Sequence, residues 1–82
     1  MAGIWTCKVV AAGPAENGAV AIWLMDTANP AQFNHWFTAV SEMKREMLSV
    51  ALTAISTGFK VDAHLTGTAE SSTINRLYLM VR

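Results

Sequence analysis

Cysteine and charged residues are scarce in this chain. Cys7 is the single cysteine among 82 residues, so no disulfide can form within the chain. Only 15% of residues are charged, whereas roughly 25% is usual in soluble domains. A domain this short buries a small share of its surface, and such domains commonly gain stability from disulfides, metals or partner subunits. With the internal disulfide excluded, a metal or a partner remains.

The sequence also lacks pairs of metal-binding residues at the short spacing that metal sites use. His35 and His64 stand far apart in the sequence, and neither has a second histidine or cysteine close by. Zinc sites typically contain pairs of ligands a few residues apart in the sequence, so we expect no metal and no cofactor. Association with other copies is then the favoured source of stability. The hydrophobic content of 52% agrees, because it leaves apolar surface for a partner.

Neither a basic excess nor a long apolar run is present. Six basic and six acidic residues give a net charge of zero, which argues against binding to nucleic acid. No apolar run approaches the roughly 20 residues that a membrane-spanning helix needs, and no signal-peptide pattern opens the chain. We expect a soluble protein without membrane insertion. It is either cytoplasmic or the mature form of a secreted domain whose signal peptide has been removed.

The first half of the chain predicts three strands. Residues 4–11 are rich in β-branched and aromatic side chains, and residues 13–18 form a turn sequence that ends in Asn-Gly. Residues 19–26 should return antiparallel, and their few polar positions predict burial on both faces. After a loop over residues 27–33, residues 35–40 predict a third short strand.

The second half predicts a helix and two further strands. Ser41 suits an N-cap, residues 42–57 have helical periodicity, and Gly58 suits the left-handed position that ends many helices. Apolar residues then alternate with polar ones over residues 59–65, and again over residues 74–82. The predicted order is β-β-β-α-β-β in one domain spanning residues 1–82.

The predicted helix has an unusually broad apolar face. At 100° per residue, its apolar side chains fill an arc of about 200°. That arc is wider than packing against one small sheet requires, so one flank should meet a neighbouring subunit. The candidate oligomer-interface residues are Met43, Met47, Val50 and Ala54.

Five strands with a helix after the third is the order of the OB-fold, so the predicted class is α+β, mainly β, a five-stranded OB-like barrel. A further likeness lies in two segments of the second half of the chain. They are the run KREMLSVALTAISTGFKVDAHL, residues 44–65, and the closing strand with Ile74, Arg76, Leu77 and Tyr78. They resemble small bacterial OB-fold proteins related to the pentameric B subunits of AB5 toxins.

This resemblance implies a ring of five subunits, with helices lining its centre, edge strands paired between neighbours and cell-surface glycans bound on the exposed barrel. The chain departs from the toxin subunits in two respects. It lacks their cysteine pair, since Cys7 stands alone, and it contains no sugar-binding motif that can be transferred residue by residue. The fold and the ring therefore transfer better than the glycan specificity.

Aromatic residues supply the candidate glycan site, which consists of Trp36, His35 and Asn34. A tryptophan face can stack on a sugar ring, and the loop before Trp36 is rich in amides. For Trp5, Trp23 and Trp36, burial in the core or at a subunit interface is the competing interpretation. His35 is open to the same alternative.

The evidence for catalytic residues is weak, so we expect that the protein is not an enzyme. Lys60, Asp62 and His64 share one strand face, which is either the solvated face of a half-buried strand or an acid-base group. No nucleophile can be placed beside them, which favours the solvated face. Cys7 is either a small buried hydrophobe or one half of an intermolecular disulfide.

The sequence therefore predicts a non-enzymatic, ring-forming binding module, with a pentamer favoured and cell-surface glycans or a protein as partner. Five weak sites on one ring bind a glycan-bearing surface better than one site does. The alternative is a purely structural homo-oligomer without a small-molecule ligand.

Overall fold

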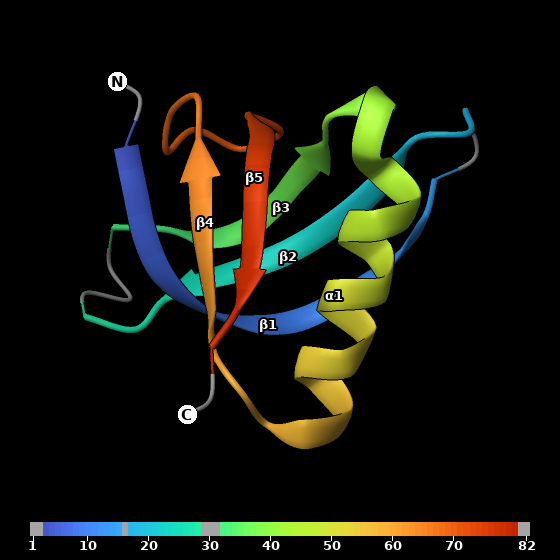
Figure 1. Ribbon diagram of the computed structural model, residues 1–82. Coiled ribbons are helices and arrows are strands. Elements are labelled where there is room, and N and C mark those ends of the chain that lie inside the picture. The colour runs from blue at the N-terminus through green and yellow to red at the C-terminus, as the bar shows by residue number, and fades with distance from the viewer. Residues whose placement is uncertain (1–2, 16, 29–31, 81–82) are drawn as a thin grey trace.

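The computed structural model describes residues 3–15, 17–28 and 32–80 (Figure 1). It contains five strands and one α-helix in the predicted order β-β-β-α-β-β. The elements are β1 (Gly3–Pro14), β2 (Val20–Asp26), β3 (Asn34–Ala39), the 3₁₀ turn η1 (Ser41–Met43), α1 (Lys44–Thr57), β4 (Val61–Leu65) and β5 (Thr73–Leu79).

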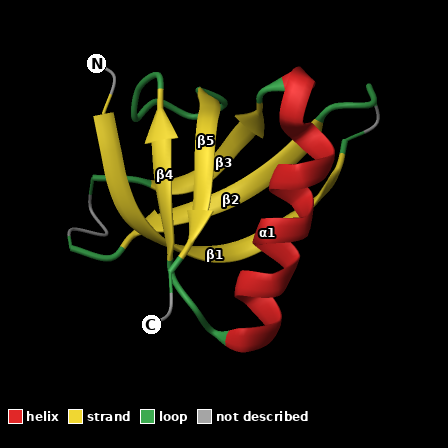
Figure 2. Ribbon diagram, in the orientation of Figure 1, coloured by secondary structure: helices red, strands yellow, loops and turns green. Residues whose placement is uncertain are grey.

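The strands close into a barrel in the order β1-β2-β3-β5-β4. The long strand β1 pairs with β4 through its first half and with β2 through its second half, both antiparallel. Among the described strands, only β3 and β5 run parallel, through two residue pairs. The helix α1 stands along one side of the barrel, against β1 and β5 (Figure 2). These connections confirm the predicted OB-like fold.

Alternation along the strands fills the barrel interior. In β2, Ile22 and Leu24 are fully buried, whereas Trp23 and Met25 between them are half-buried on the outer face. The prediction that this strand is buried on both faces was therefore wrong. A barrel strand has one inner face, and among the described residues no second layer covers the outer face of β2.

Two bulges set the curvature of the barrel. In β1, Val9 faces Leu24 and Ala11 faces Trp23, so Val10 is an extra residue and is 47% exposed. Extra residues of this kind bend and twist a strand. In β5, the register similarly skips Asn75.

The bulge in β5 corrects the predicted alternation of this strand. Because Asn75 is skipped, Ile74 and Leu77 both point inward although they are three residues apart. The alternation predicted over residues 74–82 puts Leu79 on the same face as the buried Leu77, but Leu79 is 38% exposed. Val81 lies outside the described residues.

The helix begins later than predicted and ends where predicted. Ser41 is not the N-cap of α1, because residues 41–43 form the 3₁₀ turn and the Ser41 hydroxyl donates to the Glu42 carboxylate at 3.2 Å. Gly58 is left-handed, with φ 76°, and its N–H donates to the Ala54 carbonyl at 2.9 Å. Its predicted role is confirmed. The next strand begins at Val61, two residues later than predicted.

Candidate functional site

The outer face of the β2–β3 pair brings together two tryptophans and an amide. Trp23 lies directly opposite Trp36, with ring centroids 5.4 Å apart and ring planes inclined at 64°. The Trp23 indole Nε1–H donates to the Asn34 Oδ1 at 2.6 Å. Both indoles are half-buried and Asn34 is exposed. We call these three residues the aromatic-amide face.

His35 does not join this face. Strand alternation turns His35 to the other side of β3, where its ring lies 4.8 Å from that of Phe37 and 6.1 Å from that of Phe33. The predicted group of Trp36, His35 and Asn34 is therefore divided, and Trp23 stands in place of His35. The pairing register of β2 with β3 places Trp23 there, and no local sequence pattern predicts that register.

A cleft of about 530 Å³ adjoins the aromatic-amide face and reaches the end of α1. Lys8 lies opposite Met25 across the β1–β2 pair, and Met25 lies opposite Asn34 across the β2–β3 pair. These three residues form a row across three strands. The residues lining the cleft are Lys8, Val9, Val10, Trp23, Met25, Asn34, Ala54, Ile55, Gly58 and Phe59. Lys8 is the single charged residue among them.

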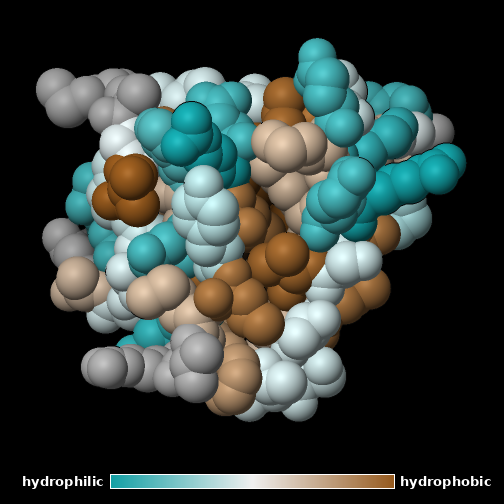
Figure 3. Space-filling view, in the orientation of Figure 1, coloured by the Kyte–Doolittle hydropathy of each residue, from teal (hydrophilic) through white to brown (hydrophobic). Residues whose placement is uncertain are grey.

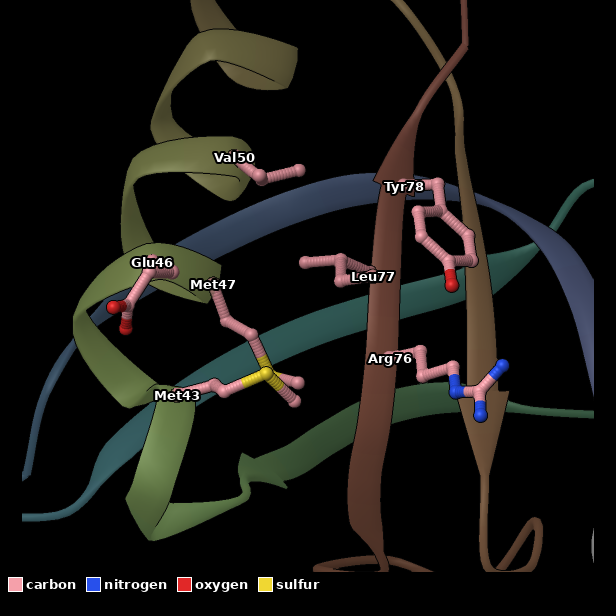
Figure 4. A pocket seen from close by; sticks show the side chains of 7 residues that line it. All are labelled: Met43, Glu46, Met47, Val50, Arg76, Leu77 and Tyr78. Carbon is pink, nitrogen blue, oxygen red and sulfur yellow. The ribbon is translucent and has the colours of Figure 1, made fainter.

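A second hollow, of about 230 Å³, separates α1 from β5, and hydrophobic side chains gather there (Figure 3). We call it the α1–β5 groove. Met43, Met47 and Val50 point from the helix toward β5, and Leu77 points back toward the helix (Figure 4). The remaining lining residues are Glu46, Arg76 and Tyr78.

The edge of β5 beside this groove has no strand partner in the described part of the chain. Parallel pairing with β3 includes only Thr73 and Ile74 of β5. The opposite edge of the strand pairs with β4 as far as Leu79. Unpaired strand edges carry backbone groups that can pair with another chain.

The structure divides the four candidate interface residues. Met47 and Ala54 belong to the core, at 3% and 2% exposed. Met43 is 41% exposed and Val50 is half-buried, so these two offer surface to a partner. On the other flank of α1, Leu52 is 49% exposed, and this flank was not among the predicted interface residues.

The polar face of β4 shows no acid-base relay. Asp62 accepts a hydrogen bond from the Thr6 hydroxyl at 2.8 Å. His64 is half-buried, and its Nδ1 has no hydrogen-bond partner within residues 3–15, 17–28 and 32–80. Lys60 is exposed. In these contacts neither Asp62 nor Lys60 orients His64, as a general base would require.

Cys7 lies inside the barrel and is fully buried, as predicted for a small hydrophobe. Burial raises the pKa of its thiol to about 12, and the negative charges of Asp26 and Asp62 add to this shift. The thiol is therefore protonated at neutral pH and is a poor nucleophile or metal ligand. Across the described residues, no three His, Cys, Asp or Glu side chains lie close enough to hold a metal ion.

These features define an OB-like barrel with an exposed aromatic-amide face and an apolar groove beside an open strand edge. Comparison of the chain with protein-family models, curated proteins and solved structures found no match. None of the helical segments described is long and apolar enough to cross a membrane.

Proposed function

We propose that the protein is a non-enzymatic binding module that recognises glycans through its aromatic-amide face. The observation that carries this proposal is the half-buried pair of Trp23 and Trp36 beside the exposed Asn34. Indole rings offer large apolar surfaces that suit the C–H face of a sugar ring, and a side-chain amide both donates to and accepts from hydroxyl groups. The face spanned by the second and third strands is also where OB-folds bind oligosaccharides and oligonucleotides.

We further propose that the module acts as a homo-oligomeric ring, with five subunits favoured by the resemblance to toxin B subunits. Two separate apolar surfaces support a head-to-tail contact. Val50 borders the α1–β5 groove, whereas Leu52 lies about 200° further round the same helix. A contact between two different surfaces is heterologous, and it closes into a ring when the rotation between subunits permits.

Features around the groove add to the case for a neighbouring subunit. The unpaired edge of β5 is a site at which a second chain could add backbone hydrogen bonds. Glu46 lies on α1 and Arg76 on β5, and neither forms an ion pair within the described part of the chain. Each therefore leaves its charge free for an opposite charge on a partner.

Glycan-array binding tests the recognition step. We expect wild-type protein to bind a subset of glycans and Trp36→Ala to lose that binding, because the stacking surface is gone. Ile4→Ala is the control, since Ile4 is an exposed apolar residue that lies outside the aromatic-amide face and lines neither the cleft nor the α1–β5 groove. Silence of the wild-type protein across the array, combined with a ring in light scattering, would instead favour a structural scaffold.

A further inference from the structure

We propose that the cleft beside the aromatic-amide face takes an anionic sugar, whose carboxylate or sulfate group pairs with Lys8. This inference rests on the proposed glycan-binding function and narrows its ligand class. It depends on the position of one cation relative to the aromatic and amide groups that already form the face.

Lys8 provides the charge. It is exposed, lines the cleft and forms no ion pair with any residue that the structure describes. Because no carboxylate among the described residues lines the cleft, none of them balances the positive charge there. A neutral ligand that covered Lys8 would remove water from the ammonium group without replacing its hydrogen bonds, which costs free energy. An anionic ligand would supply those bonds, so the cleft should discriminate in favour of negative charge.

The row of Lys8, Met25 and Asn34 sets the reach of the site. Adjacent strands lie about 4.8 Å apart, so the backbones at Lys8 and Asn34 are about 10 Å apart across β2. The long stem of Lys8 can bring its ammonium group closer to the middle of the cleft. Trp23 also lines the cleft, where it can contact a sugar ring. One sugar with a charged substituent can therefore contact the cation, the indole and the amide together.

The far wall of the cleft is apolar. Val10 comes from the bulge of β1 and Ile55 from α1, and they are 47% and 43% exposed. A wall of this kind suits the C–H face of a sugar or an apolar substituent on it. Recognition would combine burial of apolar surface with one charge-assisted hydrogen bond, which is stronger than a bond between neutral groups.

The test is a glycan array that carries neutral, carboxylated and sulfated glycans, probed with wild type, Lys8→Gln and Lys8→Arg. We expect the strongest binding among the anionic glycans, and the two anionic groups show which anion is preferred. Lys8→Gln should weaken that binding about tenfold, the loss expected for one hydrogen bond to a charged group. Lys8→Arg should retain most of it. Lys44→Gln, which removes a lysine that lines neither the cleft nor the α1–β5 groove, should bind like wild type.

Two results would overturn the inference while leaving glycan binding intact. One is strongest binding to neutral glycans, and the other is undiminished binding by Lys8→Gln when Trp36→Ala abolishes it. Failure of the wild-type protein to bind any glycan would instead overturn the proposed function, and this inference with it. Circular dichroism of each variant checks that the barrel is still folded.

Discussion

At the scale of single residues, Cys7 shows how strongly the barrel interior controls chemistry. Its side chain lies at the junction where β1 changes partner, opposite Asp26 of β2 and Val61 of β4. Its Sγ lies 3.4 Å from the Trp5 carbonyl, to which the thiol donates. Complete burial disfavours the thiolate, so the residue contributes packing to the core, and its reactivity is suppressed.

The raised pKa of Cys7 predicts a loss of stability at alkaline pH. The thiol has a reference pKa of 9.0 and a folded-state pKa of about 12. Between these values the unfolded chain has released its proton and the folded chain retains it. Stability is therefore fully present below pH 9 and falls above it, by up to about 1.4 kcal/mol per pH unit.

Urea unfolding at about pH 8 and about pH 10.5 measures this effect. We expect Cys7→Ala to be less stable than wild type at the lower pH, because it leaves a cavity, but to lose less stability between the two pH values. Parallel pH dependence in the two proteins would show that Cys7 is not the group responsible.

Substitution of Gly58 should lower the stability of the fold through backbone strain alone. A Cβ added at this residue would meet nothing within 4 Å, yet φ is 76°, a conformation that strains residues with a side chain. Gly58→Ala should therefore lower the free energy of unfolding by about 1–2 kcal/mol. Gly58→Asn should cost less, because asparagine tolerates the left-handed region. Equal stability of wild type and Gly58→Ala in urea would contradict this account.

At the scale of elements, local sequence rules predicted what depends on local geometry. The helical period and Gly58 located the end of α1 correctly, because a left-handed residue ends a helix whatever surrounds it. The prediction that Ser41 is the N-cap of α1 was wrong, because the chain makes a 3₁₀ turn before the helix begins. The bulges at Val10 and Asn75 were not predicted, because they depend on how the barrel closes.

The candidate site was partly predictable for the same reason. Asn34 and Trp36 lie two residues apart, so strand alternation alone puts them on one face. That rule also puts His35 on the opposite face, and its inclusion in the predicted site was inconsistent with it. Trp23 required the register between β2 and β3, which depends on how the two strands pair in the barrel and not on any local pattern.

A charged substitution on the exposed flank of α1 should disrupt the proposed assembly. Leu52→Glu would place a charge within the proposed apolar contact, where burial of an unpaired carboxylate is unfavourable. We expect this variant to run as a monomer in light scattering, whereas wild type runs as a ring. Ser49→Glu is the matched control, because it adds the same charge at an exposed polar position of the same helix. Equal masses for wild type and Leu52→Glu would contradict the proposed interface.

At the scale of the whole molecule, the two proposed surfaces use different parts of the barrel. The aromatic-amide face is built from β2 and β3, and the α1–β5 groove shares no lining residue with the cleft beside that face. Contact with a neighbour through the groove can therefore leave the aromatic-amide face accessible. A ring built in this way would present several weak sites on a rigid support, which is the arrangement that multivalent binding requires.

Surface plasmon resonance on sparse and dense layers of a glycan selected from the array tests multivalent recognition most directly. We expect wild-type protein to dissociate from the dense layer about 10²-fold or more slowly than from the sparse layer, because later contacts of one ring are intramolecular. Leu52→Glu, as a monomer, should dissociate at the same rate from both layers. Equal dissociation rates of the wild-type protein from the two layers would contradict multivalent recognition by a ring.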